Sequence, residues 1–166
     1  MIDTVFGKAI HVGKRVRNET AINKGSVSIG SAAVELAEDE LGTREEKTIM
    51  VIGAGEMGTL VARGLANRNL RAIYVANRTY EKAKKLADEL DGTAIKYEEM
   101  GDYIKQSDVV ISATAAPHLV VTRDMIENAM SERNKDILLV DIANPRDIEE
   151  ATAAVITAWT RILKPA

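Results

Sequence analysis

The sequence predicts an α/β fold of the Rossmann type, in which a doubly wound parallel sheet follows a leading N-terminal helix. Two observations carry this prediction. Five short segments are apolar along most of their length and alternate with segments of helical periodicity, which indicates parallel strands covered by helices on both faces. A glycine-rich turn directly follows the first apolar segment, at the place where such a turn occurs in this fold.

Composition limits the classes of protein to consider. The 166 residues suffice for one ordinary domain with a short extension, and with aromatic residues at only 4% the core must be built from aliphatic side chains and alanine. The net charge of -3 provides no positive field for nucleic acid. The chain has no cysteine, which excludes disulfides and a cysteine nucleophile within it. We expect a cytoplasmic protein, because no signal peptide or membrane span is evident.

The elements are justified in chain order. Residues 1–25 show no regular pattern, so we expect irregular structure there. From Ser26 to Leu41 apolar residues fall on one face of a helix, and Gly42 follows as a C-cap. Strands are then predicted at 48–52, 71–76, 93–95, 108–112 and 136–141, with helices at 56–68 and 79–90, a helical turn or two within 97–105 and a helix from Thr122.

This pattern divides the chain into three parts. We predict a leading segment and helix over 1–42, a dinucleotide-binding domain over 43–150, and a tail of uncertain role over 151–166. The tail fits either a helix, which would dock on the sheet or on a partner, or a non-native extension. The helix would present Ala151, Val155, Ala158, Trp159 and Ile162 on one face.

The glycine-rich turn has the spacing G-x-G-x-x-G between a strand and a helix, which is the context in which this motif binds dinucleotides. In such a motif Gly53 permits the tight turn, Gly55 lets the backbone approach a pyrophosphate, and Gly58 lets the helix pack closely. The helix N-terminus then faces the phosphates. A turn that merely needs glycines is the alternative. The candidate binding residues are Gly53, Ala54, Gly55, Glu56, Met57 and Gly58.

The second signal follows the second strand. NAD enzymes usually have an acidic residue about 20 positions past the glycines, where it binds the ribose 2′-hydroxyl. This sequence has Asn77, Arg78 and Thr79 there instead, so that Arg78 is available to pair with a 2′-phosphate. The sequence therefore predicts NADP as the cofactor, the alternative being that these residues only turn the chain and cap the next helix.

Two further loops follow later strands and would meet at the same edge of the sheet. Small residues in 112–117 leave room for the nicotinamide ribose, and the loop 141–146 could line the nicotinamide pocket, although each could also be an ordinary loop. The candidate residues are Ala113, Thr114, Ala115, Ala143, Asn144 and Pro145. His11 and His118 are the only histidines and have no partner at metal-ligand spacing, so no metal site is predicted.

Two groups of segments together resemble glutamyl-tRNA reductase. The first is the stretch from Gly13 to Thr20 with its continuation from Gly25 to Ala37, which looks like the signature before that family's cofactor domain. The second is the series of glycine motif, Asn-Arg-Thr and later loops described above, parts of which shikimate dehydrogenases share. The resemblance covers about residues 5–150.

The resemblance implies an NADP-dependent oxidoreductase of tetrapyrrole (porphyrin) biosynthesis. In that family a cysteine of an N-terminal domain attacks glutamyl-tRNA, NADPH reduces the thioester to glutamate 1-semialdehyde, and a C-terminal helix forms a homodimer. This chain would be the middle, hydride-donating part, inactive alone and with no catalytic residue of its own. Glutamyl-tRNA would be held by the other domain. The basic cluster Lys14–Arg17 could contact tRNA, but a few exposed basic residues are usually solvated or paired, which is what we expect here.

Two other functions stay open from the residues alone. One is a shikimate-dehydrogenase-like oxidoreductase, for which a substrate domain with a catalytic lysine would be needed. The other is a non-catalytic dinucleotide-binding module. The tail after Glu150 also departs from the family pattern, in which a glycine-bearing loop and a strand would lead toward the dimer helix.

Overall fold

Six parallel strands form one twisted sheet. The computed structural model describes residues 2–20, 29–41, 47–66, 70–155 and 160–162. Its strands run in the order β3-β2-β1-β4-β5-β6, which is that of a dinucleotide-binding fold and confirms the predicted fold class. The strands are β1 (Lys47–Ile52), β2 (Leu70–Ala76), β3 (Thr93–Ile95), β4 (Val109–Ser112), β5 (Leu138–Asp141) and β6 (Thr160–Ile162).

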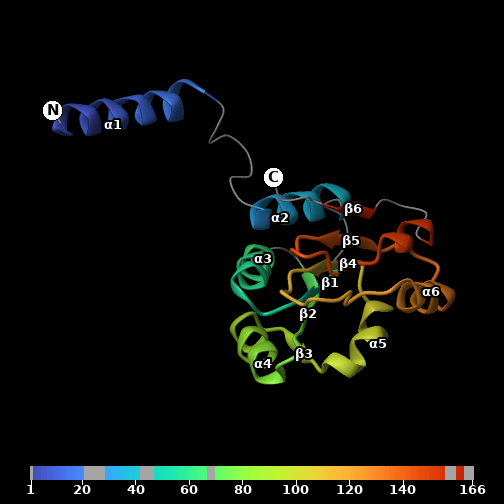
Figure 1. Ribbon diagram of the computed structural model, residues 1–166. Coiled ribbons are helices and arrows are strands. Elements are labelled where there is room, and N and C mark those ends of the chain that lie inside the picture. Colours follow the sequence, from blue (N-terminus) through green and yellow to red (C-terminus); the bar gives the residue numbers. More distant parts are fainter. Residues whose placement is uncertain (1, 21–28, 42–46, 67–69, 156–159, 163–166) are drawn as a thin grey trace.

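Helices cover both faces of this sheet. Side chains of a strand alternate between the two faces, and both faces are apolar here. On β1, Ile49 and Val51 join the core on one side, whereas Met50 and Ile52 join the core on the other. Figure 1 shows α3 and α4 on one side of the sheet and α5 and α6 on the other. These helices are α3 (Glu56–Ala66), α4 (Tyr80–Glu89), α5 (Met100–Ile104) and α6 (Arg123–Ser131), with short 3-10 helices at Tyr97–Glu99 and Glu150–Ala154.

The carboxyl ends of the central strands lie level with one another. Ile52 at the end of β1 is paired with Ala76 of β2 on one side and with Ser112 of β4 on the other. Since β1 lies at the point where the strand order reverses, the loops after these three strands begin side by side around a crevice. The register thus brings together segments that are up to 60 residues apart in the chain.

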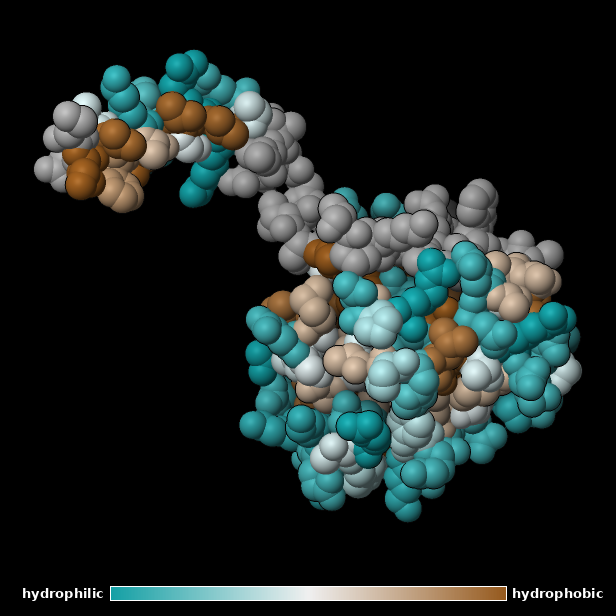
Figure 2. Space-filling model, viewed as in Figure 1, coloured by the Kyte–Doolittle hydropathy of each residue, from teal (hydrophilic) through white to brown (hydrophobic). Residues whose placement is uncertain are grey.

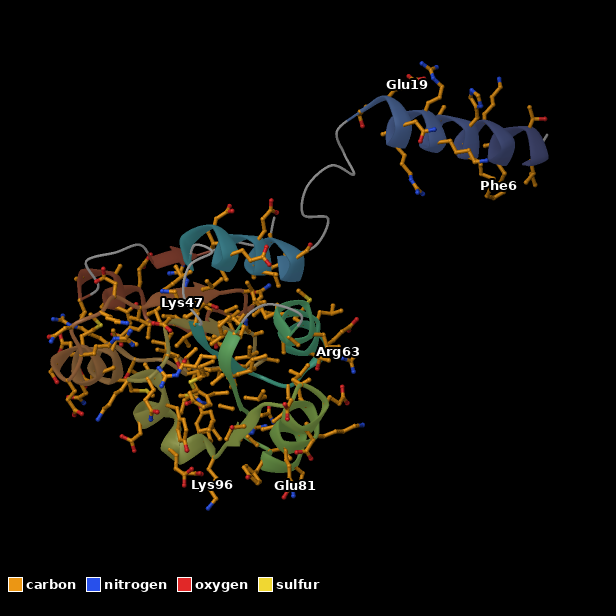
Figure 3. All side chains as sticks on the ribbon, turned by 180° about the vertical axis from the view of Figure 1, so that it is seen from behind. Phe6, Glu19, Lys47, Arg63, Glu81 and Lys96 are labelled. Atoms are coloured by element: carbon orange, nitrogen blue, oxygen red, sulfur yellow. The ribbon has the colours of Figure 1, made fainter. Side chains whose placement is uncertain are left out.

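The N-terminal segment corrects one prediction. Residues 2–19 form helix α1 (Ile2–Glu19), not irregular structure. Its apolar residues recur at helical spacing, but Gly7 and Gly13 and the β-branched residues within it weaken the local signal. Figure 1 shows α1 apart from the sheet, Figure 2 shows its apolar side chains at the surface, and Figure 3 shows Phe6 and Glu19 near its two ends. Arg15 of the basic cluster pairs with Glu19 at 3.0 Å.

The tail corrects a second prediction. Residues 150–154 form a short 3-10 helix, and residues 160–162 form β6, which pairs in parallel with β5. The single helix considered for 151–162 is therefore wrong, because hydrogen bonds to the open edge of β5 decide the conformation of the last described residues. Within the described part of the tail, residues 160–162 are thus the sixth strand of the sheet.

The predicted leading helix is α2 (Ile29–Leu41), and it packs on the sheet. Ala33 and Ala37 are fully buried in the same core as Val61 of α3. The predicted Gly42 cap and boundary loop lie outside the described residues, and the division of the chain at residue 42 stays a prediction. Among the described helices, none combines the length and the apolar character needed to cross a membrane.

Candidate functional site: a pocket at the carboxyl edge of the sheet

A pocket of about 540 Å³ opens at the crevice between the central strands, within the range of small-molecule sites. The loops after β1, β2, β4 and β5 and the 3-10 helix after β3 contribute to its walls. The lining residues are Ile52, Gly53, Ala54, Gly55, Glu56, Met57, Asn77, Arg78, Thr79, Lys82, Tyr97, Ala113, Thr114, Ala115, Ala116, His118, Val120, Ile142, Ala143 and Asn144.

The structure brings nearly all of the predicted site residues into this one pocket. Only Gly58 and Pro145 of the predicted set do not line it. Gly58 lies beneath the glycine loop, and Pro145 follows Asn144, which lines the pocket, through a cis peptide bond. Whether the lining residues contact a ligand stays a prediction.

The first glycine is required by both backbone geometry and space. Gly53 has a φ of +107°, which residues with a Cβ rarely adopt. A Cβ at this position would also lie 2.5 Å from the carbonyl oxygen of Ala113, so the end of β1 approaches the β4 loop through bare backbone. The amide of Gly53 donates to the carbonyl oxygen of Ala76 at 2.8 Å and keeps the turn in register with β2.

The other two glycines serve different ends. A Cβ at Gly58 would lie 1.9 Å from the carbonyl oxygen of Gly53, so this glycine lets α3 start directly against the turn. A Cβ at Gly55 would meet nothing within 4 Å, because this position faces open space. Gly55 is exposed just before the N-terminus of α3, where the first helical amides have no intrahelical acceptor. The space over Gly55 therefore suits an anionic group such as a pyrophosphate.

Asn77 joins the β2 loop to the glycine loop. Its Oδ1 accepts a hydrogen bond from the amide of Ala54 at 3.1 Å, and its Nδ2 donates to the carbonyl oxygen of Thr79 at 2.9 Å. The Thr79 side chain makes no capping bond to α4, although Thr79 occupies the N-cap position. Capping by the Thr79 hydroxyl, the alternative considered from sequence, is therefore not seen.

Two cations line the pocket beside this loop. Arg78 and Lys82 are both exposed, and within the described parts of the chain neither has a carboxylate at salt-bridge distance. Tyr97 lies near Arg78, and burial raises the pKa of its phenol, with the charge of Asp147 acting in the same direction and Arg78 opposing it. This end of the pocket thus offers two positive charges to an anionic ligand.

At the opposite end of the pocket, two buried carboxylates accept hydrogen bonds from the loops that form the wall. Asp147 is fully buried and accepts hydrogen bonds from the hydroxyl of Ser112 and from the amide and hydroxyl of Thr114, at 2.6 to 2.9 Å. Asp141, at the end of β5, accepts from the amides of Ala143, Asp147 and Ile148, at 2.9 to 3.0 Å. Burial raises the pKa of Asp141, and the three amides act against that rise. These contacts lock the β4 and β5 loops together.

Sequence reasoning missed several of these residues. Lys82 lies three residues past Thr79, one helical turn into α4, and Tyr97 follows β3 by two residues; both could have been found from their places at the carboxyl edge of the sheet. Asp147 carries no such signal, because only the tertiary structure brings it under Thr114. Among the described residues, no cluster of three or more side chains suits a metal ion.

Comparisons with known proteins agree with this geometry. A family model described as shikimate / quinate 5-dehydrogenase matches residues 35–160. The glutamyl-tRNA reductase of Archaeoglobus fulgidus is 57% identical over 153 residues, which cover 92% of this chain and 35% of that protein. The chain thus spans about a third of the length of the curated relatives it matches.

Solved structures give the same result. The glutamyl-tRNA reductase from Methanopyrus kandleri superposes with a TM-score of 0.76 at 52% identity, over 97% of this chain and 41% of that one. A shikimate dehydrogenase in complex with NADP+ superposes with a TM-score of 0.56 at 26% identity, over 80% of this chain and 49% of that one. The chain therefore belongs to the shikimate / quinate 5-dehydrogenase family, and nearly its whole length is homologous to part of glutamyl-tRNA reductase.

Proposed function

We propose that this chain binds NADP(H) in the pocket at the carboxyl edge of the sheet and serves as the hydride-donor site of a glutamyl-tRNA reductase. The observation that carries the proposal is the pairing of a glycine loop open at Gly55 with two cations, Arg78 and Lys82, around the same pocket. A pyrophosphate suits the first feature and a 2′-phosphate suits the second.

The choice of NADP over NAD rests on the β2 loop. Asn77 occupies the place where NAD enzymes carry an acid, and it is engaged with backbone groups on both sides. No carboxylate there would repel a 2′-phosphate, and Arg78 offers a planar guanidinium beside it. Structures of the same fold include complexes with NADP+ and with NAD, so the choice rests on the residues of this loop.

The remaining wall of the pocket is proposed to hold the nicotinamide. The β4 and β5 loops present small side chains at Ala113, Ala115 and Ala143, which leave room for a flat ring against the sheet edge. When bound, NADPH supplies a hydride. This chain's residues position the ring and exclude water from one of its faces, and none of them is proposed to react.

The reaction proposed for the whole protein is the reduction of glutamyl-tRNA to glutamate 1-semialdehyde in tetrapyrrole biosynthesis. Identity of 57% over nearly all of this chain supports that assignment. The 166 residues contain no cysteine, so the thioester-forming nucleophile is proposed to come from another domain, which also holds the tRNA. The protein is proposed to act as a cytoplasmic homodimer, and this chain by itself is expected to reduce nothing.

A shikimate-dehydrogenase-like activity is the second candidate, favoured by the family match over residues 35–160. The two candidates differ in substrate and not in cofactor, and the second would need a separate substrate domain with a catalytic lysine. The protein of the full reading frame, assayed with NADPH against glutamyl-tRNA and, in reverse, with NADP+ against shikimate, distinguishes them. Formation of glutamate 1-semialdehyde supports the first candidate, and oxidation of shikimate supports the second.

Calorimetric titration of the 166-residue chain with NADPH and with NADH tests the cofactor site itself. We expect NADPH to bind at least tenfold more tightly, on the order of 1.4 kcal/mol or more, because a charge-assisted contact to the 2′-phosphate has no counterpart in NADH. Equal affinities would contradict the choice of NADP. If neither coenzyme bound, the proposed cofactor site would be contradicted.

A further inference from the structure

The buried carboxylate of Asp147 lies directly beneath the wall of the pocket. Its Oδ2 accepts from the hydroxyl of Ser112 at 2.7 Å and from the amide of Thr114 at 2.9 Å, and its Oδ1 accepts from the hydroxyl of Thr114 at 2.6 Å. Both oxygens act only as acceptors, which is the pattern of an ionised carboxylate. Since Thr114 lines the pocket, only one residue separates this charge from the ligand space.

A second carboxylate adds to this charge. Asp141 is 2% exposed and accepts amide hydrogen bonds from Ala143, Asp147 and Ile148. Over the described ranges of the chain, neither aspartate forms an ion pair with a lysine or arginine. Hydrogen-bond donors hold both charges in place but do not cancel them, so the wall formed by the β4 and β5 loops has a negative potential.

The topology places this wall at one particular end of the pocket. Arg78 and Lys82 lie on the β2 side, the open space at Gly55 lies over β1, and Thr114 and Ala143 lie on the β4 and β5 side. A dinucleotide with its 2′-phosphate at the cations and its pyrophosphate over β1 would place its nicotinamide against Thr114 and Ala143. The two carboxylates would then lie behind the nicotinamide ring.

We propose, on the basis of the function proposed above, that Asp147, assisted by Asp141, stabilises the oxidised nicotinamide ring relative to the reduced ring in this pocket. In hydride donation the C4–H bond breaks, its electron pair leaves with the hydrogen nucleus for a carbonyl carbon of the substrate, and the ring gains one positive charge. A fixed negative charge behind the ring favours that product and makes the bound coenzyme a stronger donor. Asp147 is thus a positioning residue with an electrostatic role, and it does not touch the coenzyme.

The variant Asp147→Asn removes the charge and keeps the three hydrogen-bonded contacts, one of them with its direction reversed. An asparagine whose oxygen faces Ser112 and the Thr114 amide accepts both of their bonds, and its Nδ2 then donates to the Thr114 hydroxyl. Two variants serve as controls. Thr114→Val removes the hydroxyl that donates to Asp147 and accepts from the Ala116 amide while the charge stays, and Asp124→Asn removes an exposed acid from the first turn of α6.

The measurement is the ratio of the Kd of NADPH to that of NADP+, from calorimetry of the 166-residue chain at fixed salt. In Asp147→Asn this ratio should fall on the order of tenfold, because loss of the charge weakens NADP+ relative to NADPH. In Thr114→Val both affinities should change alike, and in Asp124→Asn neither should change. A thermal melt of each variant reports the fold separately from the ratio.

The outcomes are distinguishable from failure of the proposed function. If the unmodified chain binds neither form of the coenzyme, the function itself is contradicted. If it binds both and the ratio in Asp147→Asn stays within twofold of the unmodified value, or rises, the electrostatic role of Asp147 is overturned. Should Asp147→Asn fail to fold, the same ratio in Asp141→Asn decides: a fall supports the inference, and an unchanged ratio overturns it.

Discussion

The Oδ1 atom of Asn77 lies 3.1 Å from the amide nitrogen of Ala54 and accepts its hydrogen bond, so that the end of β2 holds the glycine loop in place. The same side chain stands where an acidic residue would select NAD. Asn77 therefore combines a structural contact with a proposed choice of coenzyme, and the two can be separated by substitution.

The variant Asn77→Asp keeps an oxygen acceptor for Ala54 but replaces the Nδ2 donor to Thr79 and adds a negative charge. We expect it to lower the affinity for NADPH on the order of tenfold or more and to leave or improve that for NADH, because the carboxylate repels a 2′-phosphate and accepts from a 2′-hydroxyl. Titration with both coenzymes measures the change. An unchanged preference for NADPH would contradict the placement of the 2′-phosphate at this loop.

Arg78→Ala should weaken NADPH binding by about 1–3 kcal/mol and leave NADH binding nearly unchanged, since the lost contact is to a charged group found in one coenzyme only. Lys82→Ala is the companion variant. We expect it to lower the affinity for NADPH by less, because the ammonium of Lys82 is a point charge on a flexible side chain. Calorimetry at two salt concentrations measures both. Equal losses of affinity for NADPH and NADH would show that these cations do not contact the 2′-phosphate.

Gly55→Val should abolish coenzyme binding while the fold survives. A Cβ at this position meets no atom within 4 Å, so the new side chain occupies the ligand's space and disturbs no packing. Thermal melts with and without NADPH report both effects: the coenzyme-dependent rise in Tm should vanish, and the Tm of the free chain should stay near that of the parent. If Gly55→Val keeps the full coenzyme-dependent rise, the glycine loop is only a turn.

Gly58→Val should lower stability as well as binding. Its Cβ would lie 1.9 Å from the carbonyl oxygen of Gly53, and because this neighbour is backbone the start of α3 must move. Overpacking of this kind costs about 1–3 kcal/mol. Urea unfolding of the free chain measures the loss, with Gly55→Val as the matched control. Stability equal to that of Gly55→Val would refute the tight contact.

The stability contributed by Asp141 should fall as the pH rises. Burial raises the pKa of this carboxyl in the folded chain above the ordinary value of 3.8, so folding favours the protonated form. That contribution is fully present below pH 3.8 and is lost as the pH rises through the folded pKa. The difference in unfolding free energy between the unmodified chain and Asp141→Asn, measured in urea from pH 3.5 upward at about half-unit steps, should therefore decrease. A difference that grows over this range would contradict the assignment.

Much of the fold could be predicted because its signals are local. Fully apolar strands between amphipathic helices indicate a parallel sheet, and the spacing of Gly53, Gly55 and Gly58 after the first strand indicates the turn. Thr122 was predicted to start a helix, and its hydroxyl accepts from the amide of Met125 as an N-cap. Each of these features depends on residues within a few positions of one another.

Other features could not be predicted, either because their local signal is weak or because they depend on contacts between distant segments. Helix α1 contains two glycines that mask its periodicity, and β6 forms because the edge of β5 offers unpaired backbone groups. The sequence by itself determined the parallel sheet, the glycine turn and the residues that follow each strand. Only the tertiary structure decided that Asp147 lies under Thr114, 33 residues earlier, because the pairing of Ser112 with Asp141 sets the two loops at one level and buries their carboxylates between them.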